Sequence, residues 1–99
     1  MATIKIEIPE ELTQYQGDIH RFVDQMIHKL WIHRDKAGWD DLDTEEVFLL
    51  LQSEVDEVQD AITFGTVPEL KDELADVANF CMIYHAVLNR QNPELELDG

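Results

Sequence analysis

The chain has 99 residues, of which 22 are Asp or Glu and 7 are Lys or Arg, so its formal net charge is −15 at pH 7. This length corresponds to one domain, and a hydrophobic content of 44 % is typical of a globular protein rather than a disordered one. The acidic balance argues against a partner that is a nucleic acid or an anionic membrane, because both attract basic surfaces.

The N-terminal residues 2–8 read Ala-Thr-Ile-Lys-Ile-Glu-Ile and alternate apolar with polar side chains from Ile4 to Ile8. Pro9 closes this run. A period of two predicts a short strand or extended arm with one apolar edge. Because a lone strand has no partner within the chain, we expect it to meet a symmetry-related copy or to lie on the helices.

A first helix is predicted from near Asp18, a suitable N-cap residue, to near Lys36. Its apolar side chains recur at helical spacing: Ile19, Phe22, Val23, Met26, Ile27 and Leu30. We expect Ala37-Gly38 to end this helix and residues 39–42 to form the connection to the next one.

A second helix is predicted to open at Asp43, with Glu46 three residues later in a capping-box arrangement, and to stop at Gly65. A stripe of apolar side chains runs along it: Val47, Leu51, Val55, Val58 and Ile62. This stripe is the face that we expect to be buried against the rest of the domain.

A third helix opens with the same arrangement at Thr66 and Glu69, has Pro68 in its first turn and ends before Pro93. Its apolar stripe consists of Leu70, Leu74, Val77, Cys81, Tyr84 and Leu88. On this face Cys81, the single cysteine, is predicted to be a small buried apolar residue. A lone cysteine and the lack of any apolar run near ~20 residues indicate a cytoplasmic protein.

The last two helices each carry a pair of carboxylates three residues apart, Glu54 with Glu57 and Glu73 with Asp76. Residues three apart lie about 60° apart around a helix, so each pair borders the predicted buried face. Packed antiparallel, the helices would bring all four carboxylates together, where they repel one another unless a cation neutralises them. Ligands that are oxygen atoms alone favour a hard ion, so the pattern predicts a site for Mg²⁺ or Mn²⁺.

A basic patch on the first helix could complement such a site. Lys29, His33 and Lys36 share one face, where they could contact a phosphate. The histidines lack the spacing of a zinc site, and the sequence contains no glycine-rich phosphate loop. A metal-dependent phosphate chemistry is therefore the first hypothesis.

Three other interpretations stay open. The carboxylate pairs can be ordinary solvated surface, which their spacing alone does not exclude. An acidic helical module can also act without catalysis, presenting its carboxylates to a basic partner as a mimic of DNA phosphates. A small helical assembly factor is the third alternative. An acidic mimic would bind basic proteins in a salt-sensitive way and would gain no stability from Mg²⁺.

Three stretches together resemble the MazG-like all-α nucleoside triphosphate pyrophosphohydrolases over roughly residues 20–90. They are Lys36-Ala37-Gly38-Trp39, then Leu51-Gln52-Ser53-Glu54-Val55-Asp56-Glu57, then Asp72-Glu73-Leu74-Ala75-Asp76-Val77-Ala78-Asn79-Phe80. The resemblance implies one domain over residues 1–99, with its helical core at roughly 18–92. It also implies an antiparallel helical bundle that is completed by a homodimer or homotetramer, because the family shares its sites between subunits.

The same resemblance implies cleavage of a nucleoside triphosphate to its monophosphate and pyrophosphate. Mg²⁺ would be held by the two carboxylate pairs, Glu54, Glu57, Glu73 and Asp76. Asn79 would reach the metal shell or the sugar, Lys36 would contact phosphate and Trp39 would lie near the base. Glu54 or Glu57 would accept the proton from the attacking water. Ala37 departs from the glycine that relatives often carry at that place.

Overall fold

The computed structural model describes residues 1–36 and 38–93, and no strand occurs in these two segments. They form three α-helices and three short 3₁₀-helices: η1 (Glu10–Tyr15), α1 (Gln16–Ile32), η2 (Arg34–Lys36), η3 (Trp39–Asp41), α2 (Thr44–Phe64) and α3 (Val67–Gln91). The prediction of an all-α fold is confirmed. Within the described part of the chain, no helix is both long and apolar enough to cross a membrane.

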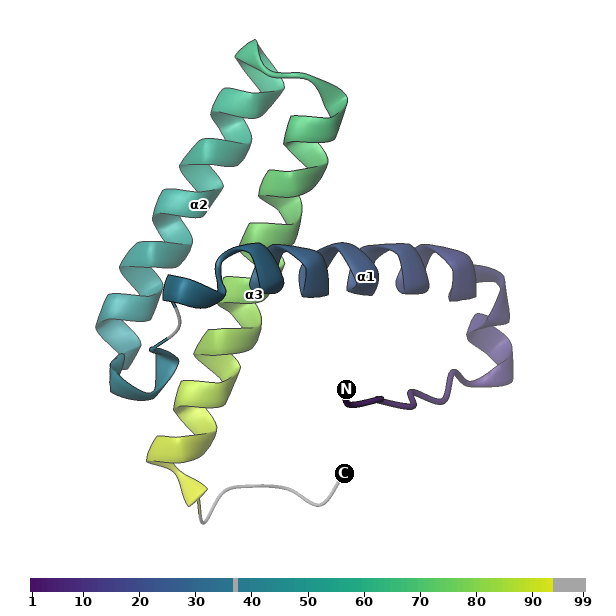
Figure 1. The fold of residues 1–99 in the computed structure, drawn as a ribbon, viewed down its shortest axis with the longest axis horizontal. Coiled ribbons are helices and arrows are strands. Elements are labelled where there is room, and N and C mark those ends of the chain that lie inside the picture. Colours follow the sequence, from purple (N-terminus) through teal and green to yellow (C-terminus); the bar gives the residue numbers. More distant parts are fainter. Residues whose placement is uncertain (37, 94–99) are drawn as a thin grey trace.

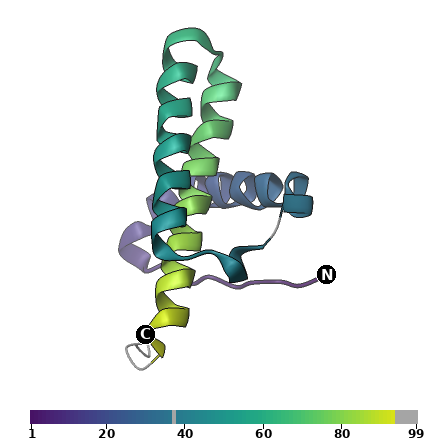
Figure 2. The same ribbon diagram turned by 90° about the vertical axis from the view of Figure 1, so that its left-hand side faces the viewer.

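The long helices α2 and α3 form an antiparallel hairpin, and α1 crosses it at a steep angle near its middle (Figure 1). Among the described elements, α2 packs on α3 alone, whereas α3 contacts α1, α2 and η3. Viewed edge-on, the hairpin has the C-terminal half of α1 and the turns that follow it on one side (Figure 2). The central helix is therefore α3.

Both helices of the hairpin begin where the sequence predicts. Asp43 Oδ1 accepts a hydrogen bond of 2.8 Å from the backbone N–H of Glu46, and Thr66 Oγ1 accepts one of 3.3 Å from that of Glu69. These side chains satisfy amide groups that have no partner within the first turn of a helix. Gly65 ends α2, as predicted, and its N–H bonds to the carbonyl of Ala61 at 3.0 Å.

The predicted limits of α1 are wrong by a few residues at each end. The helix begins at Gln16, and Asp18 lies in its first turn and pairs with Arg21 at 2.7 Å instead of capping it. It ends at Ile32, and just beyond this end Arg34 folds back onto Trp31, with its guanidinium carbon 3.9 Å from the ring centre and Nη1 donating to the Trp31 carbonyl at 2.9 Å. The stretch up to Lys36 is a 3₁₀ turn, and Ala37 lies outside the described residues.

The predicted N-terminal strand is not formed. Residues 1–9 have neither helical nor strand structure, and all of them except the half-buried Ile8 are exposed. A strand requires a neighbouring strand for its backbone hydrogen bonds, and the described part of the chain offers none. η1 follows directly after Pro9, which is its N-cap.

The core is small and lies towards the end of the hairpin at which α2 begins. Val47, Ile83 and Val87 are buried, and they are packed against partly buried side chains, namely Trp39, Leu42, Phe80 and Tyr84. In α3 the fully buried positions are four residues apart: Ala75, Asn79, Ile83 and Val87. This face is rotated from the predicted stripe, because Leu74 and Cys81 are exposed.

A similar rotation occurs in α2, where Val55 and Ile62 of the predicted stripe are exposed while Glu54 is half-buried. On α3, the polar side is the one on which α1 packs and provides partners. Asp72 accepts from Gln25 at 2.9 Å, and Asn79 donates to the carbonyl of Met26 at 3.0 Å. The prediction that the apolar stripes are the buried faces is therefore wrong for these positions, Cys81 included.

Candidate metal centre and adjoining cavity

Three of the four predicted metal ligands gather between α2 and α3. Glu54 and Glu57 lie one turn apart on α2, and Glu73 faces them from α3. One carboxylate oxygen from each of the three lies within 4.8 Å of the other two. The cluster forms because α3 runs antiparallel to α2 and brings Glu73 alongside the pair on α2.

The charged form of this cluster is disfavoured without a cation. Burial raises the pKa of Glu54 from 4.5 to about 7, assisted by a hydrogen bond with Glu57 and by the negative charges of Glu57, Asp76 and Glu73. Burial and the same contact with Glu57 also raise the pKa of Glu73. Close carboxylates shift in this way because one of them retains a proton to avoid repulsion.

Two oxygen atoms in the cluster have no hydrogen-bond donor in the described residues. Glu54 Oε2 and Glu73 Oε2 are both buried and unpartnered. A buried acceptor without a partner is costly, and most such atoms in proteins are satisfied by a donor, a water or an ion. Carboxylate oxygens are the ligands that Mg²⁺ takes, so this donor set fits the ion that the resemblance implies.

Asp76, the fourth predicted ligand, lies beside the cluster and pairs with a lysine. Lys29 Nζ is 3.4 Å from Asp76 Oδ2, and both side chains are largely buried. Burial raises the pKa of Asp76, while the positive charges of Lys29 and His33 oppose that shift. Asp76 is close enough to raise the pKa of Glu54. That Asp76 is a metal ligand stays a prediction.

A cavity of about 500 Å³ adjoins the cluster between the end of α1, the turns after it and the hairpin. One wall is basic and contains Lys29, His33 and Lys36. The other wall contains both apolar and polar side chains, namely Trp39, Leu42, Leu50, Glu54, Asp76, Asn79 and Phe80. A volume of this size is within the range of small-molecule sites.

A second cavity of about 350 Å³ opens on the other side of Lys29. It is acidic, and its lining includes Glu57, Glu73 and Asp72. Lys29 lines both cavities and lies next to carboxylates in each of them. All nine site residues predicted from the sequence line one cavity or the other: Lys29, His33, Lys36, Trp39, Glu54, Glu57, Glu73, Asp76 and Asn79.

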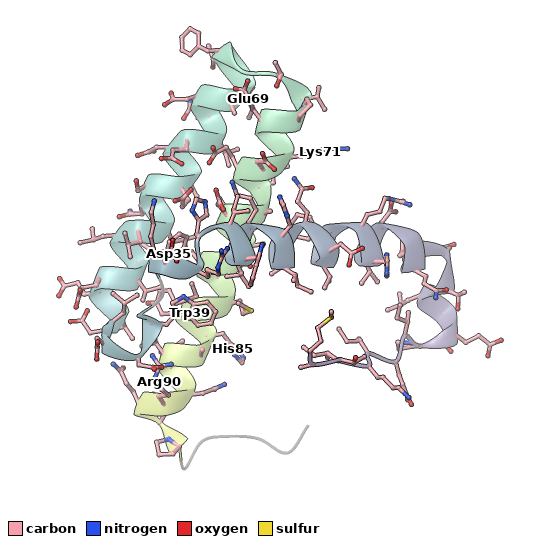
Figure 3. All side chains as sticks on the ribbon, in the orientation of Figure 1. Asp35, Trp39, Glu69, Lys71, His85 and Arg90 are labelled. Carbon is pink, nitrogen blue, oxygen red and sulfur yellow. The ribbon has the colours of Figure 1, made fainter. Side chains whose placement is uncertain are left out.

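Asn79 and Trp39 differ in how firmly they are held. The Asn79 side chain is buried and donates through Nδ2 to the Met26 carbonyl, while its Oδ1 has no partner in the described chain. Trp39 is half-buried against the core, and its carbonyl accepts a bond of 2.7 Å from Arg90 (Figure 3). Trp39 thus anchors the loop after α1, and its ring also lines the larger cavity.

The contacts that hold α1 over the site were not predicted from the sequence. Gln25 and Lys29, one turn apart on α1, bond to Asp72 and Asp76, one turn apart on α3. The sequence does contain the two polar pairs, each with its members four residues apart and therefore on one face of a helix. The apolar lining residues Leu50 and Phe80 were also missed, because a single apolar residue in a helix does not indicate a cavity.

No protein-family model matches the chain, and no solved structure matches it. The chain is similar to an uncharacterized protein of Archaeoglobus fulgidus, with 39 % identity over 54 residues. The match covers 54 % of this chain and 58 % of that protein, so the chain spans less than two thirds of the length of its relative.

Proposed function

We propose that this protein hydrolyses nucleoside or deoxynucleoside triphosphates to monophosphate and pyrophosphate in a reaction that depends on Mg²⁺ or Mn²⁺. The observation that carries this proposal is the cluster of Glu54, Glu57 and Glu73, with two buried unpartnered oxygens, next to a cavity with a basic wall. The choice of this particular reaction rests on the resemblance to the MazG-like pyrophosphohydrolases, and the biological role would be housekeeping of the nucleotide pool.

In this proposal the three glutamates hold the metal, and Asp76 joins them or orients them from its place beside Lys29. A bound divalent ion would polarise phosphoryl oxygens and lower the pKa of a coordinated water. Glu54 or Glu57 would accept the proton of the attacking water. The positive charge of the ion would lower the raised pKa of Glu54, so that the carboxylate is unprotonated and able to accept this proton at neutral pH.

The remaining residues would bind and orient the substrate. Lys29, His33 and Lys36 line the larger cavity and would neutralise phosphate charge that develops during cleavage. Trp39 offers a ring on which a base can stack. The unpartnered Oδ1 of Asn79 would accept a hydrogen bond from a sugar hydroxyl or from a metal-bound water.

The proposal includes an assembled form, a homodimer or homotetramer, and a cytoplasmic location. The support for assembly is physical: α2 packs on α3 alone among the described elements, which leaves apolar side chains of both helices exposed. Small domains bury a modest share of their surface and often gain stability from a second subunit.

The test is release of pyrophosphate from a panel of ribo- and deoxyribonucleoside triphosphates, with Mg²⁺ and with excess chelator. We expect chelator-sensitive release with equimolar monophosphate. Glu57→Gln and Glu73→Gln should each lower the rate at least about 100-fold, since each removes a charge from the site that stabilises the transition state. Asp56→Asn, an exposed carboxylate on the same helix, is the matched control.

Folded protein that releases neither pyrophosphate nor phosphate from any triphosphate in Mg²⁺ would contradict the proposed reaction. Salt-sensitive binding to basic proteins under the same conditions would then favour the acidic interaction module. The orientation of the carboxylates distinguishes the two ideas, because a mimic displays its charges to solvent, whereas Glu54 and Glu73 each bury an oxygen.

A further inference from the structure

Lys29 is a charged side chain in a buried place. With 9 % of its surface exposed, it is the one ionisable residue among those the structure describes that is buried, whereas Lys5, Lys36 and Lys71 are all exposed. Charged side chains are almost never buried unless a partner compensates the charge, because removing an ammonium from water is costly. The carboxylates around Lys29 therefore make its burial possible.

The compensating carboxylates belong to α3. Lys29 Nζ lies 3.4 Å from Asp76 Oδ2. Burial raises the pKa of both Asp76 and Glu73, and the positive charge of Lys29 opposes the two shifts. At Glu54 on α2, by contrast, burial and the negative charges of neighbouring carboxylates raise the pKa to about 7. Lys29 thus already compensates the α3 side of the cluster, and the α2 side still requires a cation.

Contacts between α1 and α3 fix the place of this ammonium. Gln25, one turn before Lys29, donates to Asp72 at 2.9 Å, and the carbonyl of Met26 accepts a hydrogen bond of 3.0 Å from Asn79. Both bonds join the two helices next to the ion pair and hold the backbone from which the lysine extends. The ammonium is therefore a built-in cation of the site and not a side chain that swings in from the surface.

The ammonium also adjoins the space in which a phosphate would bind. Lys29 lines the smaller cavity together with Glu57 and Glu73, and the larger one together with Asp76 and Lys36. Sites that use two divalent ions for phosphate chemistry hold them about 4 Å apart, where the ions stabilise the attacking and the leaving oxygen. An ammonium carries a positive charge and three N–H donors, so it can occupy one of those two places.

The charges of the site favour a single divalent ion. Together with Asp76, the three glutamates of the cluster carry four negative charges when ionised, which Lys29 reduces to three and one divalent ion reduces to one. A second divalent ion beside Asp76 would lie within a few ångströms of the ammonium. Like charges at that distance repel strongly where water is largely excluded.

We propose that Lys29 takes the place of a second divalent ion, so that each chain holds one such ion, on the three glutamates of the cluster. The N–H groups of Lys29 that do not point to Asp76 then contact a phosphoryl oxygen as a second ion would. This inference rests on the proposed function and deepens it, because it fixes the number of ions. It also gives Lys29 a role that the exposed His33 and Lys36 do not share.

The test counts the Mn²⁺ ions that bind tightly to the metal-free chain, by equilibrium dialysis and calorimetry in physiological salt, which screens the exposed carboxylates. We expect one ion per wild-type chain and two per Lys29→Met chain. The double variant Lys29→Met with Asp76→Asn should return to one ion, because the second ion loses its carboxylate. Lys71→Met is the matched control, since it removes an exposed lysine from α3 and should leave one ion.

Electron paramagnetic resonance of the bound Mn²⁺ gives a readout that a purely structural role of Lys29 would not change. Two ions on neighbouring carboxylates couple magnetically, so Lys29→Met should show a coupled spectrum and the wild type the spectrum of an isolated ion. Excess Mn²⁺ should also raise the melting temperature of Lys29→Met more than that of the wild type, because two ions bind its folded state.

Two ions per wild-type chain overturn the proposal without any variant. A folded Lys29→Met chain that binds one ion overturns it as well, while the metal centre stands. A wild-type chain that binds no Mn²⁺ contradicts the metal centre of the proposed function and this inference with it, so the two failures are distinguishable.

Discussion

Glu54 links the protonation of the candidate site to the stability of the fold. Its pKa is raised to about 7 in the folded chain from an ordinary value of 4.5. Between these two values the folded state binds more protons than the unfolded one, so the free energy of unfolding decreases as pH rises. The stabilising contribution is complete below pH 4.5 and is lost as pH rises through 7.

We therefore expect the melting temperature, measured in chelator, to fall between pH 5 and pH 8 more steeply in the wild type than in Glu54→Gln. Glutamine keeps the size of the side chain but does not titrate. Thermal melts at several pH values check this, with Asp56→Asn as the control for removal of an exposed carboxylate. Parallel curves for wild type and Glu54→Gln would show that Glu54 titrates normally.

The pair of Lys29 and Asp76 gives a second prediction at this scale. Lys29→Met leaves Asp76 buried without its counter-charge, which should cost about 3 kcal/mol in urea unfolding. Asp76→Asn should then recover part of the loss in the double variant, because the uncompensated charge is gone. Additive losses from the two substitutions would mean that the side chains do not interact.

The nine residues predicted from the sequence all line one of the two cavities, because carboxylate and basic side chains at helical spacing indicate which faces they share. The sequence did not reveal that Asp76 forms an ion pair with Lys29 beside the three glutamates. That outcome depends on where α1 crosses α3, and a contact between residues 47 positions apart has no local signature in the chain.

Among the elements, the hairpin was predicted closely because its helices begin with side chains that bond to their own first turn. Asp43→Ala should destabilise the chain by about 1 kcal/mol in urea unfolding, since the N–H of Glu46 loses its acceptor. Asp41→Ala, an exposed acidic residue two positions earlier, removes the same charge without removing a cap. Equal effects of the two substitutions would attribute the loss to charge alone.

The elements that were predicted less well lack such local determinants. α1 begins at Gln16 with no side-chain cap, so nothing in the sequence marked its start, and just beyond its end Arg34 folds over Trp31. The alternation in residues 4–8 predicted a short strand or an extended arm, and the strand is not formed because it requires another strand beside it. Periodicity also identified the apolar stripes without indicating whether the same chain or another copy covers them.

At the scale of the whole molecule, the two sides of the hairpin have opposite character. One side carries α1 (Figures 1 and 2) and the cavity with the basic wall, whereas exposed apolar side chains such as those of Ile62 and Leu74 line neither cavity. The cluster can therefore be tested independently of assembly.

The most direct test of the central claim is a titration of the metal-free protein with Mn²⁺ or Mg²⁺ at pH 8, followed by calorimetry and by the melting temperature. We expect saturable binding that raises the melting temperature, because the ion binds the folded state alone. Glu57→Gln and Glu73→Gln should abolish both effects, and Asp56→Asn should retain them. Binding that is absent in the wild type, or unchanged in both glutamine variants, would contradict the assignment of Glu54, Glu57 and Glu73 as a metal centre.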